Sequence, residues 1–256
     1  MKHILAAAQR ELLAQLAWSN VLLGFDYDGT LTPIVSDPAK AVLRAPTRKL
    51  LVELAHLYPC VVISGRSVRD VQRRVKGIGL RAVIGNHGLE PWRASEEILR
   101  TVERWKTLLE PALLDLQGVE LEDKSYSLAV HYRRARAKKT TTASILRAVR
   151  TLSEVRVIGG KQVINLLPLG APHKGMALDR ERERAGCDTA FFLGDDETDE
   201  DVFALDRPGR LLSVRVGASA GSHAMYCLKS QREVDLLLGR LIALRRDAAA
   251  LQRFAR

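Results

Sequence analysis

Short, unbroken hydrophobic runs alternate with amphipathic stretches through much of the chain. A strand buried on both faces of a sheet is hydrophobic throughout, whereas a surface helix repeats hydrophobic residues every three or four positions. The alternation therefore predicts an α/β fold in which helices cover both faces of a parallel sheet. The predicted strands are 21–25, 60–63, 82–84 and 190–193, and the predicted helices are 3–18, 46–58, 67–76 and 174–185.

Residues 93–167 follow a different pattern. A helical repeat over 95–116 is followed by two alternating strands, a second helix over 140–152 and two further strands. This order is typical of an α+β domain with an antiparallel sheet. We therefore expect 93–167 to be an inserted domain, and 1–92 together with 168–256 to form the core domain.

Polar side chains follow the predicted core strands where those strands end. Asp26 and Asp28 come directly after the first run, within Asp-Tyr-Asp-Gly-Thr, and Ser64 follows the second run. Parallel sheets bind ligands at the carboxyl ends of their strands, so these groups are expected to meet at one site. Acidic residues with Gly and Thr are also ordinary turn formers, and the pattern alone leaves that simpler interpretation open.

An acidic run follows the last predicted core strand, with six carboxylates between Asp195 and Asp201. Some of them, at Asp199 to Asp201, are expected to cap a helix, because a helix N-terminus carries partial positive charge. If several also meet Asp26, each pair of like charges ~4 Å apart costs about 4 kcal/mol at an effective dielectric of roughly 20, so a cation must be present. Since no His or Cys accompanies these oxygen ligands, Mg²⁺ is the expected ion.

Charge and composition narrow the class of protein. The 256 residues carry a net charge of +10, but the cations are spread rather than clustered with aromatic residues, so we expect no nucleic-acid partner. The hydrophobic stretches are too short for a signal peptide or a membrane span, and the three cysteines are far apart. We therefore expect a soluble cytoplasmic protein with no membrane partner, whose basic surface mildly steers an anionic substrate.

Four motifs, in order along the chain, resemble those of the haloacid dehalogenase superfamily. They are Asp26 and Asp28 with Thr30, then Ser64, then Lys174, and finally Asp195, Asp196 and Asp199. More narrowly, several segments within residues 20–230 are similar to trehalose-6-phosphate phosphatases. The resemblance implies a Rossmann-like core with an inserted α+β cap domain. The similar segments are 26–34, Ser64–Arg66, Asn86–Glu90, Glu122–Lys124, His131–Arg133 and Gly194–Glu200.

The resemblance also implies a chemical mechanism. Asp26 is the expected nucleophile, which attacks phosphorus to form an acyl phosphate that water then hydrolyses. Asp28 is the expected acid and base, because a sugar alkoxide is a poor leaving group and must be protonated as it departs. Thr30, Ser64 and Lys174 are expected to bind the phosphoryl oxygens.

By the same resemblance, Mg²⁺ is the implied cofactor. Its expected ligands are Asp26, the backbone carbonyl of Asp28, and Asp195. Asp196 or Asp199 is expected to contribute as well, directly or through water.

In the family that the chain resembles, the inserted domain closes over the sugar. Glu122, Lys124 and Arg133 match positions expected to reach it, and the spacing places His131 on the same strand face as Arg133. Lys and Arg on alternating strands often only face solvent, and a single His is more often structural, so that interpretation stays open. At the ends of the core strands, Arg66, Asn86 and His87 are also expected to bind substrate.

One departure from the family pattern concerns the sugar. Where the family usually reads Val-x-Glu-x-Arg-Pro ahead of the motif lysine, this chain has Asn165 and Leu167 in place of Glu and Arg. An amide accepts hydrogen bonds from sugar hydroxyls less strongly than a carboxylate does. We expect Asn165 to contact the substrate and trehalose 6-phosphate to be that substrate. Another sugar phosphate, such as sucrose phosphate or a phosphorylated glycosylglycerate, is the nearest alternative.

Two alternatives come from other classes of protein. One is a phosphomutase of the same superfamily, and the other is a non-catalytic module that binds phosphosugars. Because the chain has all four motifs, a loss of catalysis has little support, and release of free phosphate would separate the three interpretations. The resemblance further implies a trehalose-6-phosphate synthase as a functional partner.

Overall fold

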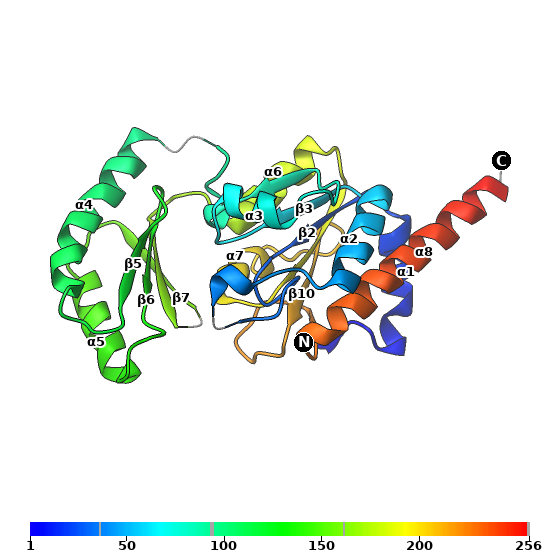
Figure 1. Cartoon of the computed structure of the whole chain (residues 1–256). Coiled ribbons are helices and arrows are strands. Elements are labelled where there is room, and N and C mark those ends of the chain that lie inside the picture. The colour runs from blue at the N-terminus through cyan, green and yellow to red at the C-terminus, as the bar shows by residue number, and fades with distance from the viewer. Residues whose placement is uncertain (36, 93–94, 161, 255–256) are drawn as a thin grey trace. The chain divides into compact units, whose positions relative to one another are not determined.

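The structure, a computed structural model, describes residues 1–35, 37–92, 95–160 and 162–254. The chain forms two compact units: unit 1 comprises Met1–Gly88 and His173–Arg256, and unit 2 comprises Leu89–Pro172. Unit 2 is therefore inserted between two segments of unit 1 (Figure 1). The boundary predicted at residue 93 lies outside the described residues.

Unit 1 is built on a seven-stranded parallel sheet of order β1-β11-β10-β9-β2-β3-β4. Strand β2 (Val21–Phe25) is buried throughout and pairs with β9 (Thr189–Gly194) on one side and β3 (Cys60–Ile63) on the other. The strand order thus reverses beside β2, and open parallel sheets bind ligands at the carboxyl ends of strands at such a point. The remaining strands are β1 (Lys2–His3), β4 (Ala82–Ile84), β10 (Leu211–Val216) and β11 (Tyr226–Leu228).

Helices cover both faces of this sheet, as the hydrophobic pattern predicts. On one face lie α1 (Arg10–Trp18), α2 (Ala45–Leu57) and α8 (Val234–Phe254), while α6 (Lys174–Arg184) and α7 (Glu200–Phe203) lie on the other and α3 (Val68–Arg74) packs beside β4.

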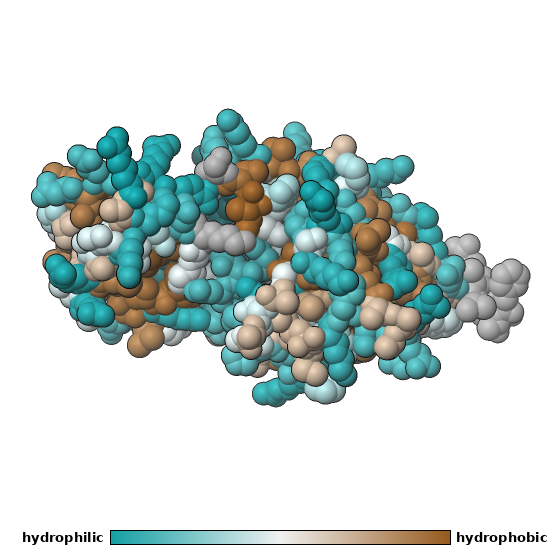
Figure 2. All heavy atoms as spheres, turned by 90° about the horizontal axis from the view of Figure 1, so that it is seen from below, coloured by the Kyte–Doolittle hydropathy of each residue, from teal (hydrophilic) through white to brown (hydrophobic). Residues whose placement is uncertain are grey.

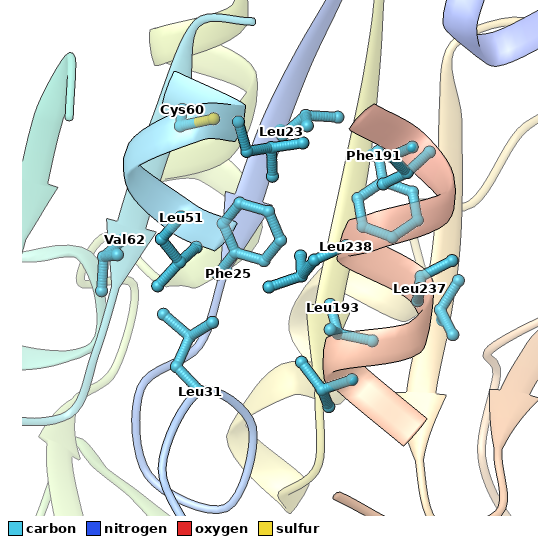
Figure 3. Close-up of a cluster of buried hydrophobic side chains, with 14 of the residues drawn as sticks. Leu23, Phe25, Leu31, Leu51, Cys60, Val62, Phe191, Leu193, Leu237 and Leu238 are labelled. Atoms are coloured by element: carbon cyan, nitrogen blue, oxygen red, sulfur yellow. The ribbon is translucent and has the colours of Figure 1, made fainter. Parts of the chain in front are cut away.

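The core of unit 1 forms between the sheet and its helices. Phe25 of β2 and Phe191 of β9 lie near Leu51 of α2 and Leu238 of α8 (Figure 3). All four side chains are fully buried. Burial of each such side chain contributes about 1.5–3 kcal/mol, so this core fixes the strands whose ends carry the motif residues.

Unit 2 contains a four-stranded antiparallel sheet of order β5-β6-β8-β7, with β5 (Glu120–Asp123), β6 (Leu128–His131), β8 (Val163–Pro168) and β7 (Val155–Gly160). Helices α4 (Glu96–Leu113) and α5 (Lys138–Val149) pack on one face of it. The N-cap of α4 is Ser95, whose hydroxyl accepts a hydrogen bond from the N–H of Ile98. Its residues Val102, Trp105 and Leu109 recur at helical spacing and are buried, which gives unit 2 a hydrophobic core of its own.

The beginning of the chain differs from the prediction. The helix predicted over residues 3–18 begins only at Arg10, because Lys2 and His3 pair with β11 as a short strand. The N–H of Ile4 also donates to the carbonyl of Cys227 at 3.0 Å. Residues 2–4 therefore join the sheet of unit 1, and a short 3-10 helix, Ala7–Gln9, leads into α1.

Hydrophilic side chains predominate on the face of the molecule shown in Figure 2, and hydrophobic ones form separate groups on it. This agrees with the spread of charge along the sequence, in which 40 Lys and Arg residues accompany 30 acidic ones. Within the described parts of the chain, no helix is both long and hydrophobic enough to cross a membrane.

Candidate active site

The first motif carboxylate, Asp26, lies directly after β2 in the interior of unit 1. Its N–H donates to the carbonyl of Leu193 at 2.8 Å, which continues the β2–β9 pairing by one residue. Its side chain is buried, and the residue is only 4% exposed. The ammonium of Lys174 donates to Asp26 Oδ1 at 2.7 Å. The sheet thus fixes the Asp26 carboxylate at a strand end beside a buried cation.

Lys174, the first residue of α6, links two carboxylates. Its Nζ also lies 2.8 Å from Asp199 Oδ1, and the residue is 2% exposed. Burial opposes the charge of the ammonium, but Asp199 and Asp26 outweigh that effect and raise the pKa of Lys174. Lys174 therefore stays protonated and provides a fixed positive charge.

Three carboxylates gather at this point. Asp26, Asp195 and Asp199 each present an oxygen within 4.8 Å of the others. Asp199 Oδ2 accepts the backbone N–H groups of Asp195 at 2.8 Å and Asp196 at 3.0 Å. Thr30 Oγ1 donates to Asp195 Oδ1 at 3.2 Å. The hydrogen bond between Thr30 and Asp195 therefore joins the loop after β2 to the loop after β9.

This donor set fits a hard divalent cation. The three carboxylates supply only oxygen ligands, and Lys174 balances only one of their charges. Burial first, then Asp199 and Asp195, raise the pKa of the Asp26 carboxyl well above its usual value, against the lowering effect of Lys174. A cation among these oxygens would offset that repulsion, and Mg²⁺ needs only a few carboxylates together with water.

Two glycines allow the carboxylates to approach so closely. Gly29 has a φ of +84°, and a Cβ there would lie 2.1 Å from Asp195 Oδ2. A Cβ at Gly194 would lie 2.4 Å from Asp199 Cγ. Any side chain at either position would push the acidic loop away. The close approach of the carboxylates therefore requires glycine at the second position of Asp-Gly-Thr and at the first position of Gly-Asp-Asp.

Asp196 has a different place from the three clustered acids. It is the N-cap of the short 3-10 helix Glu197–Asp199, and its Oδ1 accepts the N–H of Glu197 at 2.7 Å. Asp199 completes a reciprocal capping box. Helix capping was predicted for Asp199 to Asp201: Asp199 takes part in this capping box and Glu200 and Asp201 lie in the first turn of α7, but the N-cap of the 3-10 helix is Asp196, which was not predicted to cap a helix.

Asp28, the second motif carboxylate, is bound by Arg66. Arg66 Nε and Nη2 donate to its two oxygens at 2.6 and 2.8 Å. The side chain of Asp28 is 41% exposed, unlike that of Asp26. Arg66 was expected at the substrate, and the structure places its guanidinium on Asp28.

Ser64, Asn86 and His87 lie where β3 and β4 end, and they fold together. The hydroxyl of Ser64 accepts the N–H of Arg66 at 3.2 Å. The N–H groups of Asn86 and His87 donate to the carbonyls of Arg66 at 2.8 Å and Ser64 at 2.9 Å. Both residues are buried with left-handed backbone angles, and a Cβ at Gly65 would lie 2.5 Å from the His87 ring. Asn86 and His87 thus shape the loop that carries Ser64, and their contact with substrate stays a prediction.

A second charged cluster lies within unit 2. Glu122 Oε2 is 2.8 Å from His131 Nε2 and 3.8 Å from Lys124 Nζ. Across the sheet, Glu122 pairs with Ala129, and Ala129 pairs with Asn165. Directly paired residues share a face, so Glu122 and Asn165 lie in one row on the same side of this sheet.

The strand position predicted for Arg133 was wrong. Strand β6 ends at His131, and Arg133 lies in the turn that follows. The carbonyl of Arg133 accepts a hydrogen bond from Lys138 Nζ at 2.6 Å, which fixes this turn against the start of α5. Arg133 therefore does not share a strand face with His131.

Sequence reasoning missed two residues of α3 that adjoin the site. Arg66 Nη1 donates to Asp70 Oδ2 at 2.8 Å, and Arg74 Nε donates to the same oxygen at 3.0 Å. The signal was present in the sequence, because residues 66, 70 and 74 alternate in charge at a spacing of four. On a helix that spacing places opposite charges side by side.

Comparison with known proteins identifies the family of this chain. A family model described as trehalose-phosphatase matches residues 24–226. The probable trehalose-phosphate phosphatase 4 of Oryza sativa subsp. japonica is 28% identical over 271 residues, which cover 97% of this chain and 73% of that protein. The trehalose-phosphate phosphatase of Mycobacterium marinum is 33% identical over 237 residues, which cover 85% of this chain and 60% of that protein.

Among solved structures, the C-terminal domain of C. albicans trehalose-6-phosphate phosphatase is similar with a TM-score of 0.78 and 26% identity, over 92% of this chain and 97% of that one. The family match runs from β2 to β11 and so includes strands of both units and all of the acidic motif residues. The chain therefore belongs to the trehalose-phosphatase family and is a phosphatase with the haloacid dehalogenase fold.

Proposed function

We propose that this chain is a Mg²⁺-dependent phosphatase that hydrolyses trehalose 6-phosphate to trehalose and inorganic phosphate through an acyl phosphate on Asp26. The observation that carries the proposal is the buried group of Asp26, Lys174, Asp195 and Asp199 at the ends of β2 and β9. The named activity of the rice, mycobacterial and C. albicans relatives supports the choice of substrate.

In the first step, an oxygen of Asp26 attacks phosphorus and the bond between phosphorus and the sugar oxygen breaks. Asp28, in its protonated form, gives its proton to the departing oxygen. In the second step, Asp28 takes a proton from the water that attacks the acyl phosphate, which releases phosphate and restores the Asp26 carboxylate. Thr30, Ser64 and Lys174 donate hydrogen bonds to the phosphoryl oxygens. These donors stabilise the negative charge that the oxygens carry in the transition state.

Mg²⁺ bound among these acids would neutralise negative charge that otherwise repels the phosphate. Both oxygens of Asp199 already have partners, Oδ1 in Lys174 and Oδ2 in two backbone N–H groups. We therefore assign direct contact with the ion to Asp26, Asp195 and the carbonyl of Asp28, and contact through water to Asp199. Asp196, which caps a helix, is assigned to the same outer position.

We assign recognition of the sugar to unit 2, through Glu122, Lys124, His131, Arg133 and Asn165. The change from Glu to Asn at position 165 favours one competing substrate class, a different disaccharide phosphate. Because the substrate is itself the product of a glycosyl transfer to a sugar phosphate, a cytoplasmic trehalose-6-phosphate synthase is the proposed supplier.

A phosphate-release screen tests the proposal. The purified chain with Mg²⁺ would be given trehalose 6-phosphate, sucrose 6-phosphate, glucose 6-phosphate and a glycosylglycerate phosphate, and free phosphate would be measured. The expected result is the highest kcat/KM for trehalose 6-phosphate. A mutase or a binding module would release no phosphate from any of these esters. A higher kcat/KM for another ester would change the proposed substrate and leave the chain a phosphatase.

A further inference from the structure

The carboxylate of Asp28 is the target of an extended hydrogen-bond network in unit 1. Arg66 uses two of its nitrogens, Nε and Nη2, on the two oxygens of Asp28, at 2.6 and 2.8 Å. The third nitrogen, Nη1, donates to Asp70 Oδ2 at 2.8 Å. Because a guanidinium is planar, binding carboxylates along two of its edges fixes its orientation.

A further layer of this network holds Asp70 in turn. Arg74 Nε donates to Asp70 Oδ2 at 3.0 Å, while Arg74 Nη1 donates to the backbone carbonyls of Ala39 at 3.3 Å and Ala41 at 2.6 Å. The carbonyl of Ala41 also accepts the hydroxyl of Tyr27 at 3.1 Å. The network therefore starts at Asp28 and ends at Tyr27, the residue that precedes Asp28 in the chain.

The charges of the network favour its formed state. Burial opposes the charge on the Arg66 guanidinium, but Asp28 and Asp70 outweigh it and raise the pKa of Arg66. Burial likewise opposes the charge on Asp70, yet Arg74 and Arg66 lower the pKa of its carboxyl. The side chains of Arg66 and Arg74 are 15% and 14% exposed, so these pairs are shielded from water more than surface pairs are.

We propose that Asp70 and Arg74 are positioning residues that act through Arg66 to hold the Asp28 carboxyl group in place for proton transfer. This inference rests on the proposed role of Asp28. Without the network, a carboxyl group that is 41% exposed has freedom to rotate. With it, both oxygens of a protonated Asp28 still accept hydrogen bonds from Arg66, and the hydroxyl hydrogen remains to be donated to the leaving group.

The proposal predicts a dependence on the leaving group. Phenyl phosphate and p-nitrophenyl phosphate differ only in the nitro group, which lies at the ring position remote from phosphorus, but phenolate is the more basic leaving group and gains more from a proton donor. The value of kcat/KM reports the steps up to cleavage of the ester bond, and so it reports this proton transfer. Neither ester carries a sugar, so sugar recognition does not enter.

The test is the ratio of the two kcat/KM values in Asp70→Asn and in the wild type, both with Mg²⁺. General acid catalysis is worth ~10²–10⁴-fold, so misplacing the acid should cost a part of this, about 10-fold on phenyl phosphate, and less than about 3-fold on p-nitrophenyl phosphate. The variant keeps the size of the side chain but loses its charge. Thermal unfolding of each variant checks its fold.

Arg73→Ala is the matched control. Arg73 also contacts Asp70, at 3.3 Å, but its side chain is 71% exposed and it donates to Asp70 Oδ1 rather than to the oxygen shared by Arg66 and Arg74. Its ratio should equal that of the wild type. Arg74→Lys keeps the positive charge but loses the guanidinium, which donates from two nitrogens. It should change the ratio in the same direction as Asp70→Asn, and it replaces that variant if Asp70→Asn does not fold.

Equal losses on the two esters, or no loss in either variant, would overturn the proposal. Asp28→Asn separates this outcome from failure of the proposed function. If Asp28→Asn steepens the leaving-group dependence while Asp70→Asn and Arg74→Lys do not, Asp28 keeps its role and the positioning residues lose theirs. If Asp28→Asn leaves the dependence unchanged, the acid itself is misassigned.

Discussion

Two charged clusters of this protein, the acidic group around Lys174 in unit 1 and the group around Glu122 in unit 2, are built in opposite ways. In unit 1, Asp26, Lys174 and Asp199 are 4%, 2% and 0% exposed, and each contacts another member of the cluster. In unit 2, the side chains of Glu122 and His131 are 48% and 35% exposed, although they also contact one another. The unit 1 cluster is therefore fixed before any ligand arrives, whereas in the unit 2 cluster Glu122 and His131 still face water and only the side chain of Lys124, 13% exposed, is largely buried.

The energetic consequences differ as well. Removing one partner of a buried ion pair typically costs about 3–5 kcal/mol, because the other charge remains unpaired in a medium of low dielectric. An exposed pair contributes only ~0–1 kcal/mol. Preorganised charges in a buried site also need little rearrangement when charge moves in a transition state. The buried cluster of unit 1 therefore agrees with the chemical role proposed for it, and the exposed pair of unit 2 agrees with the proposed role of that unit in recognising the sugar.

The most severe test of this contrast is Asp26→Asn. The variant keeps the shape of the side chain and leaves Lys174 its contact with Asp199, so the fold should persist. An amide is not a useful nucleophile, and loss of the attacking group should lower phosphate release by at least about 10⁴-fold. Phosphate assays on trehalose 6-phosphate measure the loss. Rapid quenching of the wild type, followed by mass spectrometry, should find phosphate on Asp26, and substantial turnover by Asp26→Ala would rule out this nucleophile.

Removal of the metal should have the next largest effect. Chelation should lower turnover by ~10³-fold, since a metal that stabilises transition-state charge supplies several kcal/mol, and Mg²⁺ should restore activity. A second readout needs no substrate: Mg²⁺ at 100 times its Kd should stabilise the folded chain by about 2.7 kcal/mol, visible as a higher Tm.

Asp195→Asn supplies the control for the metal site. It should remove most of the Mg²⁺-dependent rise in Tm while the metal-free protein still unfolds cooperatively. An unchanged rise in this variant, or full turnover in excess chelator, would show that the acidic cluster does not hold the catalytic ion.

The hydrophobic pattern of the sequence predicted some strands of unit 1 and missed others. Strands β2, β3, β4 and β9 were predicted because fully buried strands have unbroken hydrophobic runs, and those runs also gave the ends where Asp26 and Asp195 lie. Strands β10 and β11 were missed, since β10 includes the polar residues Ser213 and Arg215 and so has no unbroken hydrophobic run, and β11 has three residues. Strand β1 was missed because its hydrogen bonds depend on β11, at the other end of the chain.

Side-chain partners were harder to predict than the place of the site. That several acids converge followed from the strand ends, and the grouping of Asp26, Asp195 and Asp199 agrees with it. That Asp196 turns back to cap a helix, and that Arg66 binds Asp28, depend on loop geometry and rotamers, which spacing along the chain does not fix. The strand position predicted for Arg133 was wrong because pairing with the neighbouring strands decides where a strand ends, and spacing along the chain does not fix that end either.

The smallest predicted effect concerns two cations of unit 2, Lys124 and Arg133. Lys124→Ala and Arg133→Ala should each lower kcat/KM for trehalose 6-phosphate by at least ~10-fold, or about 1.4 kcal/mol, the scale of a hydrogen bond to a charged group. Loss of the Lys124–Glu122 pair cannot itself explain such a loss, since the two atoms are 3.8 Å apart and Glu122 is half exposed. Hydrolysis of p-nitrophenyl phosphate, which has no sugar, should barely change.

Arg134→Ala is the control for charge in this last experiment, because Arg134 neighbours Arg133 in the same turn and is exposed. Parallel kinetics on trehalose 6-phosphate, sucrose 6-phosphate and p-nitrophenyl phosphate distinguish the outcomes. If Lys124→Ala and Arg133→Ala lose activity equally on all three esters, their cations support folding and unit 2 does not recognise the sugar through them. If the losses follow the sugar but the wild type prefers sucrose 6-phosphate, unit 2 keeps its role in recognition, and Asn165 becomes the first position at which to restore the family's glutamate.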